Sequence, residues 1–477
     1  MDALAECGDV ICVDRLVDPC LEMGAIIRRS YETRSPAPLF TRLTGVAAGH
    51  RVLGAPAALS SDPRRPLARV ALSLGLPAEV TGRQIVEHIA EARRRPTVPP
   101  VEVATGPCKE NIRVGPRASL EGFPAPLLHL GDGGRYINTW GTIVACTPDG
   151  TFTNWSIARI MMIDEKRLTG LVAPGQHLHK VWRQWAELGR PMPYALVQGG
   201  DPALPFVAGM PLPDGVEEAG FLGALTGKPV EVVRCETVDL MVPANAEIVI
   251  EGYLSTSPDA DEGPMGEFTG YIPQHGSKQP SYTVEAVTHR HDPIWPHVVE
   301  GQPVDEFHTA SGISLAAEIL SHLRAAGLPV STVWAPFESA THWTAITVSG
   351  TWREQLPGLT SGELVERIKD ALATCRAYVL LTRTFVLDDD IDPSNISELI
   401  WALATRWHPT EGHHVRTGPI VPLLACYSPA EQASASGPKG VYDCLLPEPG
   451  QGRLVRSSFQ HGYPADLQQE VVRTWTP

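Results

Sequence analysis

The sequence predicts a three-part protein: an α/β region over residues 1–115, a β-rich core over 116–310 and a second α/β region over 311–477. Three observations support this prediction. A strongly capped helix pattern lies in the first part, runs of β-branched and aromatic residues dominate the second, and helix and strand patterns alternate again in the third. We expect these parts to be three domains.

The clearest helix signal in the first part is the stretch VTGRQIVEHIAEARRRP, residues 80–96. Thr81 and Gln84 have the spacing of a capping box, Val80 and Ile85 that of a hydrophobic staple, and Pro96 ends the pattern. The following stretch, 93–107, is rich in proline and is predicted to be a connector.

The central part contains five segments that predict strands, separated by turn residues. They are YINTWGTIVACT (136–147), TFTNWSIARIMMID (151–164), VEVVRCETVDLMV (230–242), AEIVIEGYL (246–254) and SYTVEAVTH (281–289). A helical stretch that includes HKVWRQWAEL interrupts them between about 174 and 228. The pattern indicates a barrel or sandwich core.

In the last part, SGELVERIKDALA places Leu364, Ile368 and Leu372 on one face of a predicted helix. AYVLLTRTFVLDDDID, residues 377–392, is predicted to be a buried strand that runs to an acidic end.

Composition excludes several functions. The net charge of −15 disfavours nucleic acid, because phosphate backbones require clustered cations. The first residues lack the basic start of a signal peptide, and no apolar run is long enough for a membrane span, so we expect a cytoplasmic protein. Nine scattered cysteines without a CxxC pair predict reduced thiols rather than a zinc site.

Familiar motifs fail at specific positions. GALTGKP has three residues between Gly223 and Gly227, one fewer than a phosphate-binding loop, and Pro229 replaces the metal-binding hydroxyl. In DDDID, Pro393 replaces the turn glycine of a calcium loop. GDGGRY, residues 131–136, is predicted to be only a turn.

Four stretches carry residues suited to chemistry. NWSIAR contains Asn154, Ser156 and Arg159; APGQHLH contains Gln176, His177 and His179; MPLPDGVEEAG contains Met210, Glu217 and Glu218; EGPMGEFTGY contains Glu262 and Glu267. Asn, His and Glu form a mixed oxygen and nitrogen set that suits Mn²⁺ or Mg²⁺. Taken alone, His177 could equally be a hydrogen-bonded histidine and Glu218 a helix-start carboxylate.

Glu262 and Glu267 lie five positions apart, with Gly263, Pro264 and Gly266 between them. A helix does not bring residues five apart together, and a flat strand sends them to opposite faces. A sharply bent backbone is therefore needed if the two carboxylates meet. A structural ion pair across a bent hairpin is the alternative reading of these acids with Arg159.

Together, TNWSIARIM, GQH, MPLPDGVEEAGFLGAL, VVRCETVDLMVPA and EGPMGEFTGY resemble the UbiD-like decarboxylases, which use prenylated FMN. The resemblance runs from about residue 115 to the C-terminus and more loosely into the N-terminal part. The branch it resembles most is that of the ferulic and cinnamic (aryl-acrylic) acid decarboxylases. It implies an N-terminal α/β domain, a central split β-barrel that binds the flavin, and a C-terminal α/β domain that forms a homodimer or larger homo-oligomer.

The resemblance also implies a role for individual residues. Asn154, His177 and Glu218 match the ligands of a divalent metal, usually Mn²⁺, that bridges to the flavin phosphate. Trp155, Ala208, Met210 and Glu218 match a K⁺ site. Ser156 and Ile157 match phosphate contacts, Gln176 a contact near the flavin ring, and Lys439 a basic phosphate contact. Arg159, Glu262 and Glu267 match the catalytic set.

The implied reaction is the reversible, non-oxidative loss of CO₂ from an α,β-unsaturated acid, giving a terminal alkene. The substrate would add to prenylated FMN by 1,3-dipolar cycloaddition, and a flavin prenyltransferase would supply the cofactor. After CO₂ leaves, Glu267 would protonate the vacated carbon while Glu262 and Arg159 orient it.

The predicted substrate pocket departs from this branch. Phe268 follows the acid, His342 stands where an aliphatic residue is expected, Leu445 lies near a phenylalanine position, and Phe459 matches a second phenylalanine. These departures leave two substrate classes open: a longer acrylic or polyene acid, such as a secondary metabolite, and an aromatic or heteroaromatic acid. A plain FMN-binding protein or flavin reductase is a third alternative, and a carboxylase would use the same residues.

Overall fold

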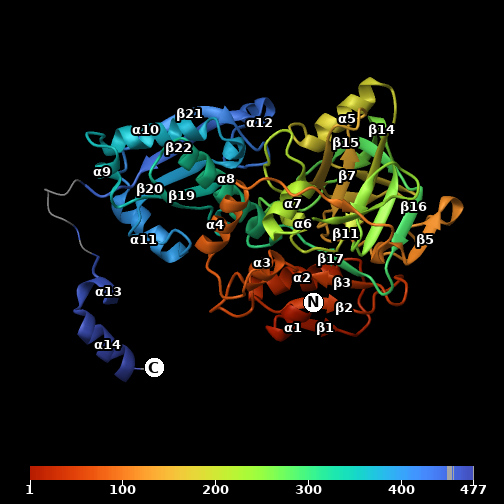
Figure 1. The fold of residues 1–477 in the computed structure, drawn as a ribbon, viewed down its shortest axis with the longest axis horizontal. Helices are drawn as coiled ribbons and strands as arrows, with labels where there is room; N and C mark the ends of the chain where they lie inside the picture. Colours follow the sequence, from red (N-terminus) through yellow and green to blue (C-terminus); the bar gives the residue numbers. More distant parts are fainter. Residues whose placement is uncertain (448–453, 455, 476–477) are drawn as a thin grey trace.

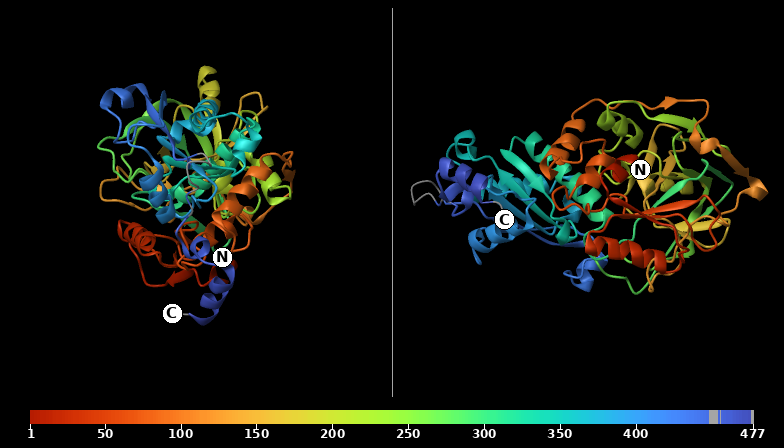
Figure 2. Two further views of the ribbon diagram at one scale, coloured as in Figure 1. Left: turned by 90° about the vertical axis from the view of Figure 1, so that its left-hand side faces the viewer. Right: turned by 90° about the horizontal axis from the view of Figure 1, so that it is seen from below.

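The computed structural model describes residues 1–447, 454 and 456–475. The chain builds one sheet near the N-terminus, a large central sheet with a small companion, and one sheet in the C-terminal part (Figure 1). Figure 2 shows the C-terminal part at one end of the molecule and the central part at the other.

The N-terminal sheet has four strands in the order β1-β2-β3-β17. β1 pairs parallel with β2, β2 antiparallel with β3, and β3 parallel with β17. The strands are β1 (Val10–Val13), β2 (Ala37–Phe40), β3 (Arg51–Gly54) and β17 (Ile294–His297), and the helices of this part are α1 (Asp2–Glu6), α2 (Glu22–Thr33), α3 (Ala68–Ser73) and α4 (Gly82–Ala92). The fourth strand therefore comes from far along the chain, beyond the boundary at 115 that the sequence indicated.

Helix α4 begins as predicted. Thr81 Oγ1 accepts a hydrogen bond from the Gln84 amide at 3.3 Å, and the Gln84 side chain accepts one from the Thr81 amide at 2.8 Å. Ile85 and Ile89 on α4 are buried in a core that includes Phe221 and Ile319 of two other helices. The first α/β part is thus packed against both later parts.

The central sheet has ten strands, and all of its pairings are antiparallel. Eight form the path β6-β9-β10-β15-β14-β11-β7-β8, and β16 joins β14 to β5. The strands are β5 (Asn111–Val114), β6 (Tyr136–Asn138), β7 (Thr142–Cys146), β8 (Thr153–Ile157), β9 (Ile160–Met162), β10 (Arg167–Gly170), β11 (Met192–Gln198), β14 (Ile248–Glu262), β15 (Ser277–Thr283) and β16 (Ala286–His289).

The predicted 230–242 strand segment does not join this sheet. It forms β12 (Glu231–Arg234) and β13 (Met241–Pro243), which with β4 (Val101–Glu102) make a separate three-stranded sheet. The predicted helical interruption is present as α5 (His177–Glu187), α6 (Leu204–Ala208) and α7 (Glu218–Thr226).

The C-terminal sheet has the order β18-β19-β20-β22-β21, with β19, β20 and β22 parallel. Core residues of α8 and α10 cover one face, and those of α11 cover the other. The strands are β18 (Val330–Trp334), β19 (Trp343–Val348), β20 (Arg383–Asp388), β21 (His413–Pro419) and β22 (Ser436–Asp443), and the helices are α8 (Gly312–Ala325), α9 (Trp352–Gln355), α10 (Ser361–Leu372), α11 (Ile396–Arg406), α12 (Pro429–Ser434), α13 (Phe459–Gly462) and α14 (Ala465–Thr474).

Two predictions for this part have different outcomes. Leu364, Ile368 and Leu372 are buried on one face of α10, as predicted. The predicted strand over 377–392 is wrong at its start, because residues Arg376–Leu380 form the 3₁₀ helix η5 and only Arg383–Asp388 pair as a strand.

Helices α13 and α14 lie away from the sheet of the C-terminal part and bury none of their described side chains (Figure 1). Among the described residues, no helix combines the length and apolar character needed to cross a membrane. All nine cysteines lie in described positions and are free, as the sequence predicted.

Candidate active site

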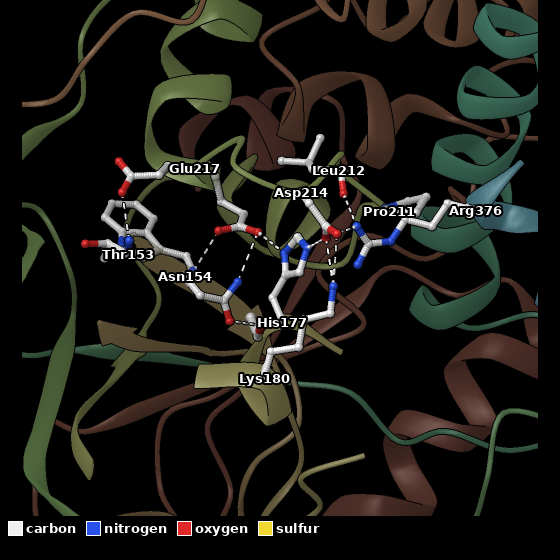
Figure 3. A network of polar contacts seen from close by, with 12 residues as sticks. Thr153, Asn154, His177, Lys180, Pro211, Leu212, Asp214, Glu217 and Arg376 are labelled. Atoms are coloured by element: carbon white, nitrogen blue, oxygen red, sulfur yellow. Dashed lines mark hydrogen bonds and ion pairs between the residues drawn. The ribbon is translucent and has the colours of Figure 1, made fainter. Parts of the chain in front are cut away.

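Three predicted ligand residues meet although they come from separate elements (Figure 3). Asn154 lies on β8, His177 is the first residue of α5, and Glu218 is the first residue of α7. Asn154 Nδ2 donates to Glu218 Oε1 at 3.1 Å, and His177 Nδ1 lies 3.7 Å from the same oxygen. All three residues are buried.

The hydrogen bonds around His177 favour a cation at this point. Its Nε2 lies 2.9 Å from Asp214 Oδ1, and the tautomer that donates this hydrogen bond directs the lone pair of Nδ1 toward Glu218. Two acceptors then face each other at a separation too long for a hydrogen bond. Mn²⁺ or Mg²⁺ between Nδ1, the Glu218 carboxylate and the Asn154 carbonyl oxygen would satisfy them, so the donor set fits the implied metal.

Among the described residues, no group of three His, Cys, Asp or Glu side chains is placed to hold a metal. The cluster contains only two such residues, and its third member is the Asn154 amide. Ser156 Oγ donates to Asn154 Oδ1 at 2.5 Å, and the Trp155 amide donates to Glu218 Oε2 at 2.8 Å. These bonds orient the side chains in the absence of a metal.

Asp214 connects this cluster to two cations. Its carboxylate accepts from Lys180 Nζ at 2.9 Å and pairs with Arg376 Nη1 at 3.1 Å, while Arg376 also donates to the Leu212 carbonyl at 2.6 Å (Figure 3). Hydrogen bonds from Lys180 and His177 hold the pKa of Asp214 well below its usual value. Arg376, from η5, therefore brings a positive charge of the C-terminal part to the cluster.

Lys439, predicted as the basic phosphate contact, is not part of this network. It lies on β22, almost fully buried, and its Nζ donates to the carbonyls of Tyr378 and Leu381 at 2.6 Å and of Val379 at 3.2 Å. Burial lowers its pKa to about 7. The contact of Lys439 with the cofactor phosphate stays a prediction. The basic groups bonded to Asp214 beside the metal cluster are Arg376 and Lys180, which no motif had identified.

The remaining predicted cofactor contacts lie around the cluster. Trp155, Ser156 and Ile157 follow Asn154 along β8, and Gln176 is the exposed N-cap residue of α5. Ala208 ends α6, and the Met210 carbonyl accepts from the Leu212 amide at 2.9 Å. The predicted K⁺ residues are therefore grouped at the β8–α6–α7 junction, and K⁺ binding stays a prediction.

The predicted catalytic residues form a second cluster. Arg159 Nε donates to Glu262 Oε1 at 2.9 Å and Nη2 to Glu262 Oε2 at 3.0 Å, a bidentate pair, while Nη1 pairs with Glu267 Oε1. Glu262 has no exposed area and Glu267 is 7% exposed. Burial alone would lower the pKa of Arg159, but the two carboxylates raise it above its usual value. The bent segment does bring both acids to one arginine.

The bend between these acids depends on glycine. Strand β14 ends at Glu262, and Gly263 then adopts a positive φ of 75°. A Cβ at Gly266 would lie 2.5 Å from the ring of His129, closer than any side chain tolerates. The loop 263–268 therefore returns to Arg159 only because small residues allow it to pack this tightly.

The GDGGRY segment, predicted to be only a turn, supports this loop. Asp132 Oδ1 accepts from the Gly266 amide at 2.9 Å, and the Gly133 amide donates to the Pro264 carbonyl at 2.7 Å. Tyr136 OH donates to Glu262 Oε1 at 3.0 Å. Burial and the Glu262 charge raise the pKa of Tyr136, so it remains a phenol donor.

The loop is also held from its other side. His308 Nε2 donates to the Phe268 carbonyl at 2.8 Å, and Asp305 lies 3.0 Å from His308 Nδ1. Arg28 of α2 pairs with Asp305 at 3.1 Å. His308 and Asp305 have no exposed area. Residues of the first and central parts therefore position the peptide next to Glu267, a long-range arrangement that no local pattern could have indicated.

Glu300 is another residue that the motifs missed. Burial raises its pKa well above the usual value, and the nearby charges of Glu267 and Asp305 raise it further. A further carboxyl group with a raised pKa therefore lies near the predicted proton donor.

Two of the predicted pocket residues are near the catalytic loop. Phe268 stacks on Phe307 with ring centroids 3.8 Å apart, and the His342 ring lies 5.8 Å from Phe268. His342 Nδ1 donates to the Leu380 carbonyl at 2.6 Å. Burial lowers the pKa of His342 to about 4, so it is neutral near pH 7.

The other two pocket residues are not brought there. His342 directly precedes β19, at the amino end of the parallel strands. At this end the first residue of β19 pairs with Arg383 of β20, which in turn pairs with Gly440 of β22. Leu445 lies five residues beyond Gly440, about 16 Å along the strand direction, beside the other end of β20. Phe459 lies on α13 and is 42% exposed. Leu445 is therefore a core residue of the opposite sheet end rather than a neighbour of His342.

Comparison with protein families matches most of the chain to one enzyme family. Residues 1–89, 100–303 and 308–469 match the N-terminal, Rift-related and C-terminal domains of 3-octaprenyl-4-hydroxybenzoate carboxy-lyase, UbiD.

Two curated relatives match over nearly their full lengths. The chain is 42% identical over 482 residues to pyrrole-2-carboxylic acid decarboxylase of Pseudomonas aeruginosa, covering 100% of this chain and 96% of the relative. It is 35% identical over 487 residues to ferulic acid decarboxylase 1 of Saccharomyces cerevisiae, again covering 100% and 96%.

Solved structures of the same class share the fold. An evolved dimeric form of the UbiD-class enzyme HmfF from Pelotomaculum thermopropionicum, in complex with prFMN, is 27% identical with a TM-score of 0.78 and 95% coverage of both chains. The 3,4-dihydroxybenzoic acid decarboxylase AroY of Klebsiella pneumoniae, in its apo form, is 25% identical with a TM-score of 0.80, covering 100% of this chain and 99% of that one. The protein is therefore a carboxy-lyase and belongs to the UbiD family of decarboxylases.

Proposed function

We propose that this enzyme uses prenylated FMN to decarboxylate an unsaturated carboxylic acid, with Glu267 as the proton donor. The observation that supports this most directly is the buried Arg159–Glu262–Glu267 cluster, in which one guanidinium contacts two carboxylates. A plain FMN carrier catalyses no reaction that such a proton-delivery site could serve. The relatives named as decarboxylases support the same reaction.

The cofactor phosphate would bind at the Asn154–His177–Glu218 cluster through Mn²⁺. The metal would supply positive charge for the phosphate, and Arg376 and Lys180 would add to it in a protein whose net charge is −15. Ser156, Ile157 and Gln176 lie next to the cluster and would contact the flavin. K⁺ would bind beside it, near Trp155, Ala208, Met210 and Glu218. When bound, the prenylated flavin accepts the electron pair that is released as CO₂ leaves.

The chain itself supplies positioning and a proton. After the C–COO⁻ bond breaks, a proton from the Glu267 carboxyl forms the new C–H bond at the carbon that lost CO₂. Glu267 is then reprotonated from solvent. Arg159 and Glu262 keep Glu267 oriented, because Glu262 is fixed by two bonds from Arg159 and one from Tyr136. In the reverse direction the same residues would serve a carboxylase.

Two substrate classes remain. The branch resemblance favours an acrylic or polyene acid, which would give a terminal alkene. A heteroaromatic acid is the second candidate, favoured by the 42% identity to a pyrrole-2-carboxylic acid decarboxylase. The stacked Phe268 and Phe307 rings offer a flat apolar wall that suits a planar acid of either class.

The test is to purify the enzyme after co-expression with a flavin prenyltransferase and to offer cinnamate, sorbate, pyrrole-2-carboxylate and furan-2-carboxylate. We expect CO₂ release from at least one acid and a prenylated flavin mass after denaturation. Glu267→Gln should lose turnover while keeping the cofactor, and Glu187→Gln, an exposed change on α5, should lose neither. Release of unmodified FMN from a fully active enzyme would overturn the proposal.

A further inference from the structure

A cavity of about 510 Å³ lies outside both clusters, between the end of α4, helices α7 and α8, and the 211–216 segment. Figure 1 shows these three helices together where the parts of the protein meet. The volume of the cavity is typical of small-molecule sites. None of the catalytic or metal-cluster residues lines it.

The charges that line the cavity are mainly positive. Four arginines line it, Arg93, Arg94, Arg95 and Arg324, against one acid, Glu318. Three of them pair with carboxylates: Arg93 with Glu318, Arg324 with Glu87 and Arg95 with Glu91. Within the described part of the chain, Arg94 has no ion pair, so the cavity keeps one excess positive charge.

Two buried donors in the wall have no acceptor among the described residues. Arg93 is 9% exposed at its side chain, and its Nη1 makes no hydrogen bond. Ser321 Oγ on α8 is also buried without a partner. Buried donors are nearly always paired, so two of them at one cavity indicate a missing acceptor oxygen. A carboxylate offers two such oxygens and a negative charge that complements the exposed Arg94.

Apart from Thr97 and His322, the rest of the wall is apolar. Leu212, Val216 and Phe221 contribute side chains from the segment before α7 and from α7 itself, and Ala90 contributes from α4. A ligand that bonded only to the polar groups of the cavity, such as inorganic phosphate, would leave these apolar side chains in contact with water. The combination favours a carboxylate that carries an apolar body.

We propose that this cavity is a second, non-catalytic binding site for an apolar monocarboxylic acid. The carboxylate accepts from Arg93 Nη1 and Ser321 Oγ, and its body lies against Leu212, Val216 and Phe221. Only the 211–214 segment separates the site from the metal cluster, since the Leu212 side chain lines the cavity while the Leu212 carbonyl accepts from Arg376. The ligand therefore contacts the segment that carries Asp214, the partner of His177.

The test is calorimetric titration of benzoate into the purified holoenzyme. The double variant Arg94→Gln/Ser321→Ala removes two recognition groups without disturbing the Arg93–Glu318 pair, and Ala325→Trp fills the cavity from an exposed helix end. Arg183→Gln, an exposed arginine on α5, is the matched control. We expect one benzoate site to weaken at least tenfold in both cavity variants and to be unchanged in the control.

Benzyl alcohol and inorganic phosphate test the two halves of the ligand. The proposal predicts that neither displaces benzoate from the cavity site at equal concentration, because one lacks the charge and the other the apolar body. Unchanged benzoate isotherms in both cavity variants would overturn the site, and displacement by either probe would overturn the ligand class. Because the titration measures binding and not turnover, the benzoate result can be interpreted even if the proposed decarboxylation is wrong.

Discussion

Arg159 holds Glu262 through two parallel hydrogen bonds of 2.9 and 3.0 Å and directs its remaining nitrogen to Glu267. The bidentate fork requires a planar guanidinium, which lysine does not have. Glu262 is fully buried, so the two hydrogen bonds from Arg159 are also the main interactions that offset the lost hydration of its carboxylate.

Arg159→Lys should therefore damage both activity and folding. We expect kcat to fall by about 10²-fold or more, because Glu267 loses its orientation. The free energy of unfolding should fall by roughly 3–5 kcal/mol, the usual cost of leaving a buried charge poorly paired. Steady-state rates and chemical denaturation measure the two effects. Arg183→Lys, at an exposed site, should change neither, and a fully active Arg159→Lys enzyme would contradict the role.

Asp132→Ala should lower kcat through the position of the catalytic loop. The Asp132 carboxylate accepts from the Gly266 amide, next to Glu267, and a displacement of about 1 Å can cost 10²-fold in rate. We expect kcat to fall by roughly 10- to 100-fold with KM nearly unchanged. Asp132→Asn keeps one carbonyl acceptor and should recover part of the rate.

Asp164→Ala is the control for that series, because Asp164 pairs only with surface Arg167 and backbone amides of its own turn. Equal rates for Asp132→Ala and Asp132→Asn would show that the hydrogen bond to Gly266 is unimportant.

Metal affinity should depend on Asp214 as well as on the three ligands. Asp214 orients His177 from behind, and changing such a partner typically costs 10- to 100-fold in metal affinity. We expect Asp214→Asn to weaken Mn²⁺ binding by about that factor and Glu218→Gln to weaken it further. Equilibrium dialysis of Mn²⁺ measures both, with the exposed Asp239→Asn as control. Unaltered Mn²⁺ affinity in Glu218→Gln would remove the metal from this cluster.

His342 should make the protein acid-sensitive. Burial lowers its folded-state pKa to about 4, whereas the unfolded chain binds a proton near 6.5. The unfolded state therefore gains protons first, so stability is complete above pH 6.5 and falls between 6.5 and 4, by about 3 kcal/mol from this group.

His342→Gln should flatten that part of the pH profile of the free energy of unfolding, while the exposed His275→Gln should leave it as in the parent. Parallel profiles for His342→Gln and the parent would assign the acid sensitivity to other groups.

Local signals predicted local structure well. The Thr81–Gln84 box begins α4, and the apolar spacing of Leu364, Ile368 and Leu372 faces the core of α10. Each depends on residues within a few positions of one another. The start of the predicted 377–392 strand failed because tertiary bonds, including those from Lys439 to three carbonyls, hold its first residues in a 3₁₀ turn.

The assembly of the site was predictable only through the resemblance. Asn154, His177 and Glu218 come from three elements, and Glu262 meets Arg159 across more than a hundred residues. Leu445 was misplaced because the direction of β22 relative to β19 cannot be read from either strand alone. Arg376 and Asp132 were missed because neither carries a local pattern that distinguishes it from a surface charge.

Strand β17 has a consequence for how the molecule is made. Residues 294–297 complete a sheet whose other strands lie within the first 54 residues. During synthesis on the ribosome, the opening segment must wait for most of the polypeptide to emerge before its last edge is filled. A gene fragment ending near residue 115 should therefore yield an aggregation-prone product rather than a free-standing module, because its β3 edge stays open to other chains.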